Sequence, residues 1–325
     1  MQDVRIAAAQ FEHRNGDKEF NLGRIRELTR QAVEGGAEIV SFHECSISAY
    51  SFVQALSKAE LADLAEPVPD GPSCRALIEI AGEFGVPVLA GLFERDGEKI
   101  YNTYVCAAGE EIVAKFRKLH AFVNPHLSSG DDFCVFDLNG CRCAILICYD
   151  NNLVENVRIA ALAGAEIVFM PHVTGCLPSV MPGRGLVDPK LWDNRERDPA
   201  ALRMELNGPK GRGWLMRWLP ARAYDNGIYA VFTNPIGIDD DQVRNGNSMI
   251  LDPFGEVIGE CTNLGDDVTV ALCAAEKIVQ SSGRRYIRAR RPDLYGTLVE
   301  PSSEPPVTEP GWQRRTASDV DTKGP

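Results

Sequence analysis

The sequence lacks any uninterrupted apolar run of the length needed to cross a bilayer, which is about 18–20 residues. Its first residues, MQDVRIAAAQF, also lack the basic segment and long apolar core that mark a secretory signal peptide. We therefore expect a chain that neither enters a membrane nor is exported. The expected location is the cytoplasm.

An excess of positive charge is missing as well, because 34 lysines and arginines face 46 aspartates and glutamates. The formal net charge of −12 argues against nucleic acid and anionic membrane surfaces as partners. It leaves a small-molecule substrate open, since a local pocket can oppose the global field. With 44% hydrophobic residues over 325 positions, the chain can bury the core of one large domain.

The ten cysteines contain no CxxC pair, so the usual spacing of a structural zinc site is absent. Cys141, Cys143 and Cys148 lie close together in the sequence. Alternation along a strand would point the first two to one face and Cys148 to the other. We therefore expect no metal, and reduced thiols in a chain without an export signal.

An internal echo links two parts of the chain. GAEIVSFHE begins at Gly36 and GAEIVFMPH begins at Gly164, and each follows a segment of helical period. Those segments follow the strand-like runs VRIAAAQF and CAILICYD, and two Gly-containing hairpin patterns, NTYVCAAGEEIVAKFRK and NSMILDPFGEVIGE, extend the parallel. The sequence thus predicts an α/β fold over residues 1–300, a four-layer α-β-β-α sandwich built from two similar halves.

Two segments interrupt this pattern. Residues 174–213 are rich in proline, glycine and charge, and we expect a long excursion with one short helix at DPAALRMEL. Its place after a strand suggests that it borders a pocket, although an exposed insertion or an oligomer contact remains open. Residues 301–325 are too polar and proline-rich to build a core, so an extended or disordered tail is expected.

Three residues with complementary chemistry close strand-like runs. Glu44 ends AEIVSFHE, Lys118 ends EIVAKFRK and Cys148 ends AILIC, and functional groups gather beyond the carboxyl ends of such strands. A carboxylate can take the thiol proton, and a lysine with a backbone N–H, that of Tyr149, can stabilise an oxyanion. Each residue alone is equally typical of a packed thiol, a salt-bridged acid or a surface lysine. Acyl transfer to a thiol fits the set.

The segments FHE, FRKLH and LICYDNNLVEN, in this order and spacing, resemble the motifs of the nitrilase superfamily of carbon–nitrogen hydrolases. The resemblance covers nearly the whole chain. It implies Glu44 as general base, Lys118 as oxyanion stabiliser and Cys148 as nucleophile, with no metal or organic cofactor. It also implies a homodimer or higher homo-oligomer that forms through the face bearing the nucleophile helix.

One departure from the family pattern concerns a second glutamate, which usually follows the lysine and positions it. No glutamate lies between the lysine and the cysteine of this chain. Asn124 and His126 are the expected substitutes, with Asp131 and Asp132 as further candidates. We favour a neutral His126 that accepts a hydrogen bond from Lys118. Because histidine gains its proton near pH 6.5, this arrangement predicts a loss of activity below about that pH.

Four further residues are candidates for substrate binding. His172 falls at the same offset in its half as Glu44 in the other, although a hydrogen-bonded structural histidine fits that position equally well. Tyr149 follows the nucleophile, and Tyr50 follows the glutamate segment. Trp192 lies in the excursion and is expected to shape the pocket for the acyl group.

The residues after the nucleophile distinguish branches of the superfamily. Cys148-Tyr149-Asp150 looks like the amidase branches, whereas nitrilases commonly have Cys-Trp-Glu. Asn151 and Asn152 stand where carbamoyl amino acid hydrolases tend to place an arginine, which favours an amide without a carboxylate at that spot. We predict an amidase that releases ammonia or an amine through a cysteine thioester. The alternatives are a nitrilase, an N-carbamoyl hydrolase, or a catalytically weakened binding module, which only the missing glutamate favours.

Overall fold

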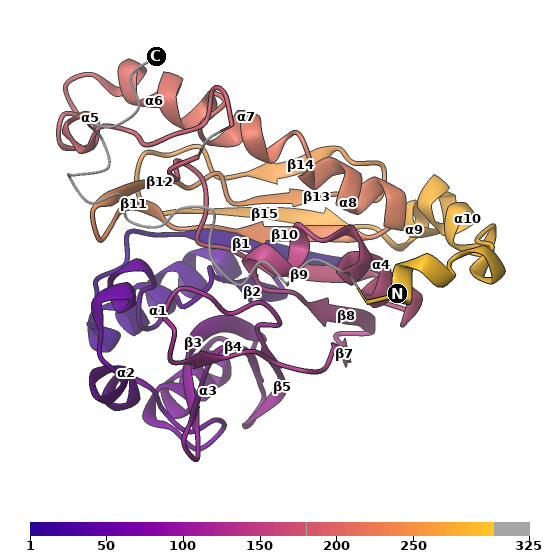
Figure 1. Cartoon of the computed structure of the whole chain (residues 1–325), viewed down its shortest axis with the longest axis horizontal. Helices are drawn as coiled ribbons and strands as arrows, with labels where there is room; N and C mark the ends of the chain where they lie inside the picture. Colours follow the sequence, from indigo (N-terminus) through magenta and orange to yellow (C-terminus); the bar gives the residue numbers. More distant parts are fainter. Residues whose placement is uncertain (180, 302–325) are drawn as a thin grey trace.

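The computed structural model describes residues 1–179 and 181–301. Two β-sheets pack face to face, and helices cover their outer faces (Figure 1). The first sheet has the strand order β15-β1-β2-β3-β4-β5, with β6 beside β4, and the second has the order β14-β13-β10-β9-β8-β7. The predicted α-β-β-α sandwich is confirmed.

The strands of the first sheet are β1 (Val4–Gln10), β2 (Ile39–Ser41), β3 (Val88–Asp96), β4 (Lys99–Ala108), β5 (Glu111–Arg117), β6 (Leu127–Ser128) and β15 (Asp267–Cys273). Those of the second sheet are β7 (Cys134–Leu138), β8 (Cys141–Ile145), β9 (Ile167–Pro171), β10 (Tyr229–Thr233), β13 (Met249–Leu251) and β14 (Val257–Glu260). A separate hairpin consists of β11 (Ile236–Asp239) and β12 (Gln242–Asn245). The last strand, β15, returns to the first half and pairs antiparallel with β1.

The α-helices are α1 (Lys18–Glu34), α2 (Lys58–Leu64), α3 (Pro72–Phe84), α4 (Val154–Leu162), α5 (Pro189–Asp193), α6 (Pro199–Asn207), α7 (Arg212–Leu215), α8 (Leu219–Asn226), α9 (Ala275–Gln280) and α10 (Ser282–Arg288). The 3₁₀ turns are η1 (Ser51–Ala55), η2 (Cys148–Asn151), η3 (Pro292–Leu294) and η4 (Gly296–Val299). Asp17 caps α1 by accepting a hydrogen bond from Phe20 N, as short polar residues do at helix starts. Among the described residues, no helix combines the length and apolarity needed to cross a membrane.

The apolar runs of the sequence are continuous because both faces of the central strands are buried. In β1, Ile6 and Ala8 face the core between the two sheets. Ala7 and Ala9 face the other way and join the core under α1 and α3. Alternate side chains of one strand therefore pack into two separate hydrophobic cores.

The internal echo corresponds to two equivalent units, β1-α1-β2 and β8-α4-β9, and the predicted hairpins are β4–β5 and β13–β14. Three details differ from the prediction. The strand expected to run to Glu44 ends at Ser41. Strand β7 pairs antiparallel with β8, and the β11–β12 hairpin is an additional element.

The excursion at 174–213 carries the expected helix as α6, which Asp198 caps by accepting from Ala201 N. It also contains α5 and the start of α7. Its apolar side chains form a small core of their own, made of Cys176, Val187, Trp192, Leu202 and Leu206 with Ile236 and Val243 of the β11–β12 hairpin.

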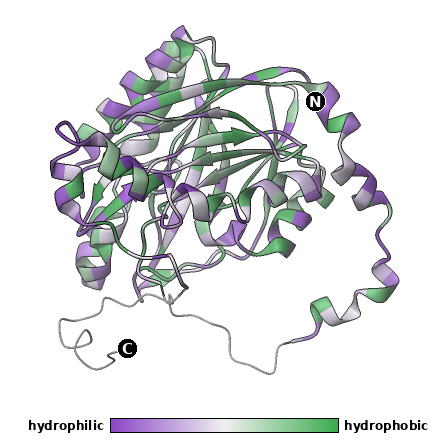
Figure 2. Cartoon of the chain, turned by 90° about the horizontal axis from the view of Figure 1, so that it is seen from above, coloured by the Kyte–Doolittle hydropathy of each residue, from purple (hydrophilic) through white to green (hydrophobic). Residues whose placement is uncertain are grey.

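The predicted tail lies almost entirely outside the described residues, which end at Pro301. Before that point, the last turns of the chain stand off the main body (Figure 2). They expose apolar side chains to solvent, because Leu294, Leu298 and Val299 are 66%, 64% and 85% exposed.

Candidate active site

Glu44, Lys118 and Cys148 come from three different segments and meet at one end of the paired sheets. Glu44 lies three residues beyond β2, Lys118 directly follows β5, and Cys148 opens η2. Lys118 Nζ donates to Glu44 Oε1 over 2.6 Å, and both side chains are completely buried. Removing either partner of such a pair would leave an uncompensated charge in the protein interior, which is strongly destabilising.

Cys148 occupies a strained turn between β8 and α4. Its φ of +50° lies in the left-handed region, which costs a non-glycine residue of the order of 1–3 kcal/mol. The turn leaves Cys148 8% exposed, with Sγ 3.9 Å from Val173 O. Val173 N donates to Glu44 Oε2 over 3.0 Å. The backbone of one residue therefore contacts both the acid and the thiol.

Glu44 is also held by a side chain of β4 and by the backbone turn that follows it. Asn102 Nδ2 donates to Glu44 Oε1 over 2.6 Å, and the next residue, Cys45, has a left-handed φ of +47°. Gly91 in β3 allows this turn, because a Cβ there would overlap the backbone nitrogen of Cys45. Neither Asn102 nor Gly91 is indicated by the sequence patterns, since strand pairing alone brings them to the glutamate.

Charge and burial set the proton positions in the site. Burial, and secondly the carboxylate of Glu44, raise the pKa of Cys148 to about 12, against a lowering by Lys118. Burial by itself would lower the pKa of Lys118, but the charge of Glu44 outweighs it and the pKa is well above its usual value. The resting site therefore holds a neutral thiol and a protonated lysine.

The structure corrects the expectation that Asn124 or His126 in the following loop contacts Lys118 in place of the second glutamate. Asn124 is buried and donates from Nδ2 to Val53 O and Leu56 O, over 2.7 and 2.9 Å. His126 is exposed, and only its backbone N–H is bonded, to Asn124 Oδ1. Among the described residues, no hydrogen bond joins either side chain to the lysine, so Asn124 fixes the loop and His126 faces solvent.

The turn that presents the thiol is anchored on two sides. Asp150 is fully buried and accepts from Leu119 N, His120 N and His120 Nδ1, over 3.2, 3.0 and 2.7 Å. On the other side, Arg222 of α8 donates to the carbonyl oxygens of residues 151 and 152, over 2.9 and 2.7 Å. Asp150 also contributes to the raised pKa of the neighbouring lysine. It is a second carboxylate that the prediction had not considered.

Aromatic rings lie around the lysine and beside the nucleophile turn. The rings of Tyr50 and Phe122 lie 5.3 and 5.0 Å from Lys118 Nζ. The Tyr149 ring meets Phe122 edge to face and is 39% exposed. Among the described residues, the Tyr149 backbone N–H and the Tyr50 hydroxyl make no hydrogen bond, so both are open to a ligand. Phe122 was not predicted, because its loop has no strand or helix period.

Two candidate residues lie away from the thiol. His172 is completely buried behind the turn, with Nε2 3.2 Å from Asn151 Nδ2, and its ring packs on Phe232. Burial, and then the charge of Lys118, hold the pKa of His172 well below its usual value, so it is neutral. Trp192 is 3% exposed within the small core of the excursion. The structure thus gives both residues packing contacts rather than a place at the mouth of the site.

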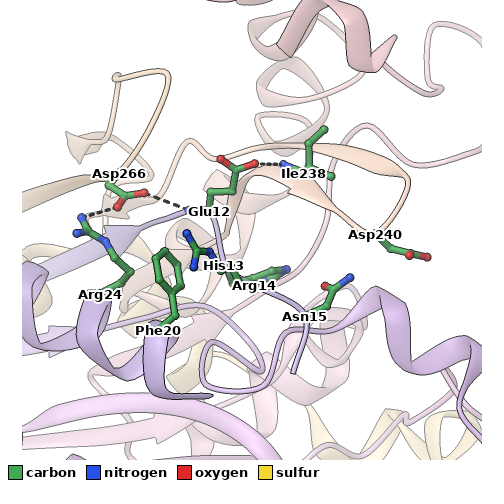
Figure 3. A pocket seen from close by; sticks show the side chains of 9 residues that line it. All are labelled: Glu12, His13, Arg14, Asn15, Phe20, Arg24, Ile238, Asp240 and Asp266. Atoms are coloured by element: carbon green, nitrogen blue, oxygen red, sulfur yellow. Dashed lines mark hydrogen bonds and ion pairs between the residues drawn. The ribbon is translucent and has the colours of Figure 1, made fainter. Parts of the chain in front are cut away.

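A separate pocket of about 620 Å³ lies beside the β11–β12 hairpin (Figure 3). Two of its charged side chains form an ion pair, since Arg24 bonds Asp266 over 2.5 Å, and Glu12 accepts from the backbone nitrogen of Ile238 over 3.0 Å. It contains no thiol, and we do not assign the reaction to it. Among the described residues, no group of three or more metal-ligating side chains gathers anywhere.

The sandwich and the residues at its strand ends define the class of the protein, the nitrilase superfamily. The model of the carbon–nitrogen hydrolase family matches residues 5–281. The chain belongs to this family, as the sequence resemblance predicted.

Several characterised proteins are similar over most of their length. An (R)-stereoselective amidase of a Pseudomonas species is 30% identical, covering 91% of this chain and 95% of its own. A nitrilase of Pyrococcus abyssi is 26% identical, covering 82% and 88%, and an omega-amidase of Mus musculus is 28% identical, covering 91% and 98%. A solved amidase of Nesterenkonia sp. superposes with a TM-score of 0.68 at 23% identity, covering 91% and 97%. That likeness concerns the fold.

Proposed function

We propose that this carbon–nitrogen hydrolase cleaves linear amides through a thioester on Cys148. The observation that carries the proposal is the buried Glu44–Lys118 ion pair beside the thiol, with Val173 contacting both the acid and the sulfur. A protonated thiol next to an ionised carboxylate is the arrangement that general-base activation requires.

In the first half-reaction, Glu44 takes the Cys148 proton as the sulfur bonds to the amide carbon. The carbonyl oxygen becomes an oxyanion, which Lys118 Nζ and the uncommitted N–H of Tyr149 stabilise. Collapse of this intermediate breaks the C–N bond, and Glu44 gives its proton to the departing amine, so that ammonia or an amine leaves.

In the second half-reaction, water attacks the thioester and Glu44 takes one of its protons. The C–S bond breaks, the acid leaves, and the thiol regains the proton from Glu44. The carboxylate thus returns to its starting state after each half-reaction, and every step uses side chains and backbone groups of this chain.

Lys118 must stay protonated throughout, and the site supports this without a second glutamate. The raised pKa of Lys118 arises against burial through Glu44, with smaller contributions from neighbours that include Asp150. Asp150 comes from the nucleophile turn itself and is held by the loop after β5. We propose that it supplies part of the electrostatic support given by a second glutamate elsewhere in the family.

The names of the relatives support an amide as substrate, because two of the three are amidases. The third is named nitrilase, so a nitrile is the natural comparison in the test. The test measures ammonia release from a panel of aliphatic and aromatic amides and nitriles. We expect turnover of at least one amide, and an enzyme mass increased by the acyl group after rapid quenching.

Two variants locate the acyl group. Cys148→Ala should abolish both the turnover and the mass increase, while Cys134→Ala, which removes a half-buried thiol of β7, should keep them. Turnover retained by Cys148→Ala, or an acyl group on another cysteine, would remove the proposal. If ammonia is released only from nitriles, the proposed substrate class changes from amides to nitriles.

We also propose that the protein forms a homo-oligomer through the outer face of α4. Val154, Ile159 and Leu162 of this helix are 52%, 41% and 42% exposed, which is unusual for apolar side chains gathered on one helix. Light scattering after size exclusion should give at least a dimer, and Ile159→Glu should shift it toward the monomer. A monomeric wild type at micromolar concentration would contradict this part.

A cytoplasmic location completes the proposal. All ten cysteines are free, and a reducing compartment keeps thiols in that state.

A further inference from the structure

A group of buried polar and charged side chains adjoins the candidate active site, and the proposed reaction does not use it. The group consists of His13, His43, Ser51, Asp239 and Arg244, which are at most 4% exposed. The last two belong to the β11–β12 hairpin, and the other three belong to the first half of the chain. Complete burial of a cation and an anion is tolerated only where hydrogen bonds satisfy both.

Asp239 is the centre of this group. Its Oδ1 accepts from Ser51 N and from His13 Nε2, each over 3.0 Å. Its Oδ2 accepts from Ser51 Oγ and from Arg244 Nε, over 2.6 and 2.9 Å. Burial would raise the pKa of Asp239, but the charge of Arg244 and the bond from His13 hold it well below its usual value. The carboxylate is therefore ionised and only accepts, which places a hydrogen on His13 Nε2.

His43 extends the group by one more hydrogen bond, because its Nε2 lies 2.9 Å from His13 Nδ1. Burial lowers the pKa of His43 well below its usual value, so its ring carries one hydrogen. Among the described residues, the other ring nitrogen, Nδ1, is buried without a hydrogen-bond partner. A hydrogen there would be an unsatisfied buried donor, so it belongs on Nε2. The bonds thus run from His43 through His13 to Asp239.

Two members of the group lie at the ends of the segment that carries the acid. His43 directly precedes Glu44, and Ser51 closes the same bend of the chain. Between them, Cys45 and Ala49 have left-handed φ angles of +47° and +66°. Such conformations persist only where the surrounding structure holds them. The bonds to one carboxylate hold this segment at both ends.

Arg244 connects the group to the segment that follows β9. Its Nη2 donates to Ser51 Oγ over 2.9 Å, and its Nη1 donates to Gly175 O over 3.3 Å. Gly175 lies two residues after Val173, whose peptide groups contact the acid and the thiol. The hairpin therefore contacts both segments that bring the acid to the thiol.

We propose that the Asp239–Arg244 pair of the β11–β12 hairpin, acting through two histidines, positions Glu44 against the thiol. The inference rests on the proposed function, in which Glu44 is the general base. The hairpin residues are positioning residues, because they act through the backbone beside Glu44. A displacement of about 1 Å at a reacting group can cost about 10²-fold in rate, so the position of the base decides kcat.

His43→Phe is the main test. It removes the bond to His13 and keeps a ring against Phe11, whose ring centre lies 4.6 Å away. For an amide that the wild type hydrolyses, kcat should fall about 10–10²-fold while KM stays within about twofold, because the base moves and the binding surface does not. An unchanged kcat in a variant that folds, as checked by circular dichroism, would overturn the inference.

Asp239→Asn and Glu66→Gln form a matched pair. Glu66 is also a buried carboxylate, and it accepts from Ser73 N, Ser73 Oγ and Lys18 Nζ, over 2.8, 2.9 and 2.6 Å. It joins α1 to α3, whereas Asp239 joins the hairpin to the segment of the acid. Both substitutions should lower the melting temperature, since each leaves a cation without its carboxylate. Only Asp239→Asn should lower kcat, and equal kcat values in the two folded variants would overturn the inference.

A second readout needs no amide. After burial, the carboxylate of Glu44 is the main cause that raises the pKa of Cys148, so moving it away lowers that pKa. Alkylation of Cys148 by iodoacetamide, followed by mass spectrometry between about pH 7 and 10, should therefore shift to lower pH in His43→Phe. We expect about half a pH unit or more, in the same direction as in Glu44→Gln. Glu66→Gln should keep the wild-type profile.

The double variant separates positioning of the acid from any other effect. Because His43 acts through Glu44, His43→Phe should add no further shift in a Glu44→Gln background. A further shift there, or a wild-type profile in His43→Phe alone, would overturn the inference. If the wild type hydrolyses no amide, the amidase function fails, and the alkylation profiles still decide whether the hairpin positions Glu44.

Discussion

Glu44 and His172 occupy equivalent places in the two halves of the molecule, yet only Glu44 faces the thiol and the lysine. Each stands eight residues after the first glycine of the repeated GAEIV motif. Glu44 turns into the site and bonds Lys118, Asn102 and the backbone of Val173. His172 turns behind the nucleophile and packs among aromatic rings.

The backbone explains the divergence. In the first half, β2 stops at Ser41, and the left-handed Cys45 bends the chain over Gly91. In the second half, β9 continues to Pro171, and His172 N still bonds Thr233 O. One half therefore contributes an acidic side chain, and the other contributes the peptide groups of Val173. Sequence repetition preserves the scaffold, while the local path of the chain decides what reaches the site.

The largest expected difference is in kcat, between substitutions of Glu44 and of His172. Glu44→Gln keeps the shape but removes the base, so kcat should fall about 10²–10⁴-fold, the usual contribution of a general base. His172→Gln, at the equivalent position, should lower kcat much less and act through stability. We would measure kcat of both variants from steady-state ammonia release and check their folding by circular dichroism. Equal losses of kcat would erase the distinction.

The bend after β2 provides the next test. Gly91→Ala forces a methyl group against the backbone of Cys45, which should cost about 1–3 kcal/mol of unfolding free energy. Displacement of Glu44 should also reduce kcat, by up to about 10²-fold for a shift near 1 Å. The control is Gly82→Ala in α3, where a Cβ meets nothing within 4 Å and should stabilise by about 0.5–1 kcal/mol. Similar effects of both substitutions in urea unfolding would contradict the role of the bend.

Asn124 and His126 lie in the loop after β5, and the sequence alone predicted the same role for both. Asn124→Ala removes the bonds to the carbonyl groups of Val53 and Leu56 and the one accepted from His126 N, and it should cost about 1–3 kcal/mol. His126→Ala changes an exposed side chain, so its effect should stay within about 0.5 kcal/mol and the pH–rate profile should be unchanged. Thermal unfolding and the pH dependence of kcat/KM measure both. A shifted profile in His126→Ala would restore that residue as the partner of the lysine.

The last test concerns the pH dependence that His172 gives to stability. Its pKa is held well below the usual value by burial and by Lys118, so the unfolded chain binds the proton first. Its contribution is therefore complete above about pH 6.5 and is lost as the pH falls, by at most about 1.4 kcal/mol per pH unit. His172→Phe should flatten the unfolding free energy between pH 4.5 and 6.5. His43, also buried with a lowered pKa, should keep the remaining slope. An unchanged slope would show that His172 is charged or exposed.

Much of this architecture follows from periodicity. The repeated motif, the hairpin patterns and the polarity break at Cys148 predicted the sandwich, and family membership confirmed the carbon–nitrogen hydrolase. The hairpin of β11 and β12 was missed, because IGIDDDQVRN lacks the apolar alternation of a strand. Strand β7 was missed too, since CVFDL is mostly half-buried and reads as a loop.

Site residues were harder to predict wherever strand pairing alone joins them. Asn102 reaches Glu44 because β4 pairs with β3 in a register that sets it opposite Phe93, and no local pattern encodes that register. Trp192 was expected at the pocket, but an apolar ring in an excursion can equally fill a local core, and it does so here. The offset that singled out His126 gave a position in the chain but no side-chain direction.

The contacts of Val173 have a consequence for how this site can be mapped and how it can change. Both use peptide atoms, the N–H toward the acid and the C=O toward the sulfur. A scan that trims side chains would pass over residue 173, because every replacement except proline offers the same two atoms. Its side chain is thus free to vary with the neighbouring core, while the two peptide groups on either side of its Cα keep their contacts with the acid and the thiol.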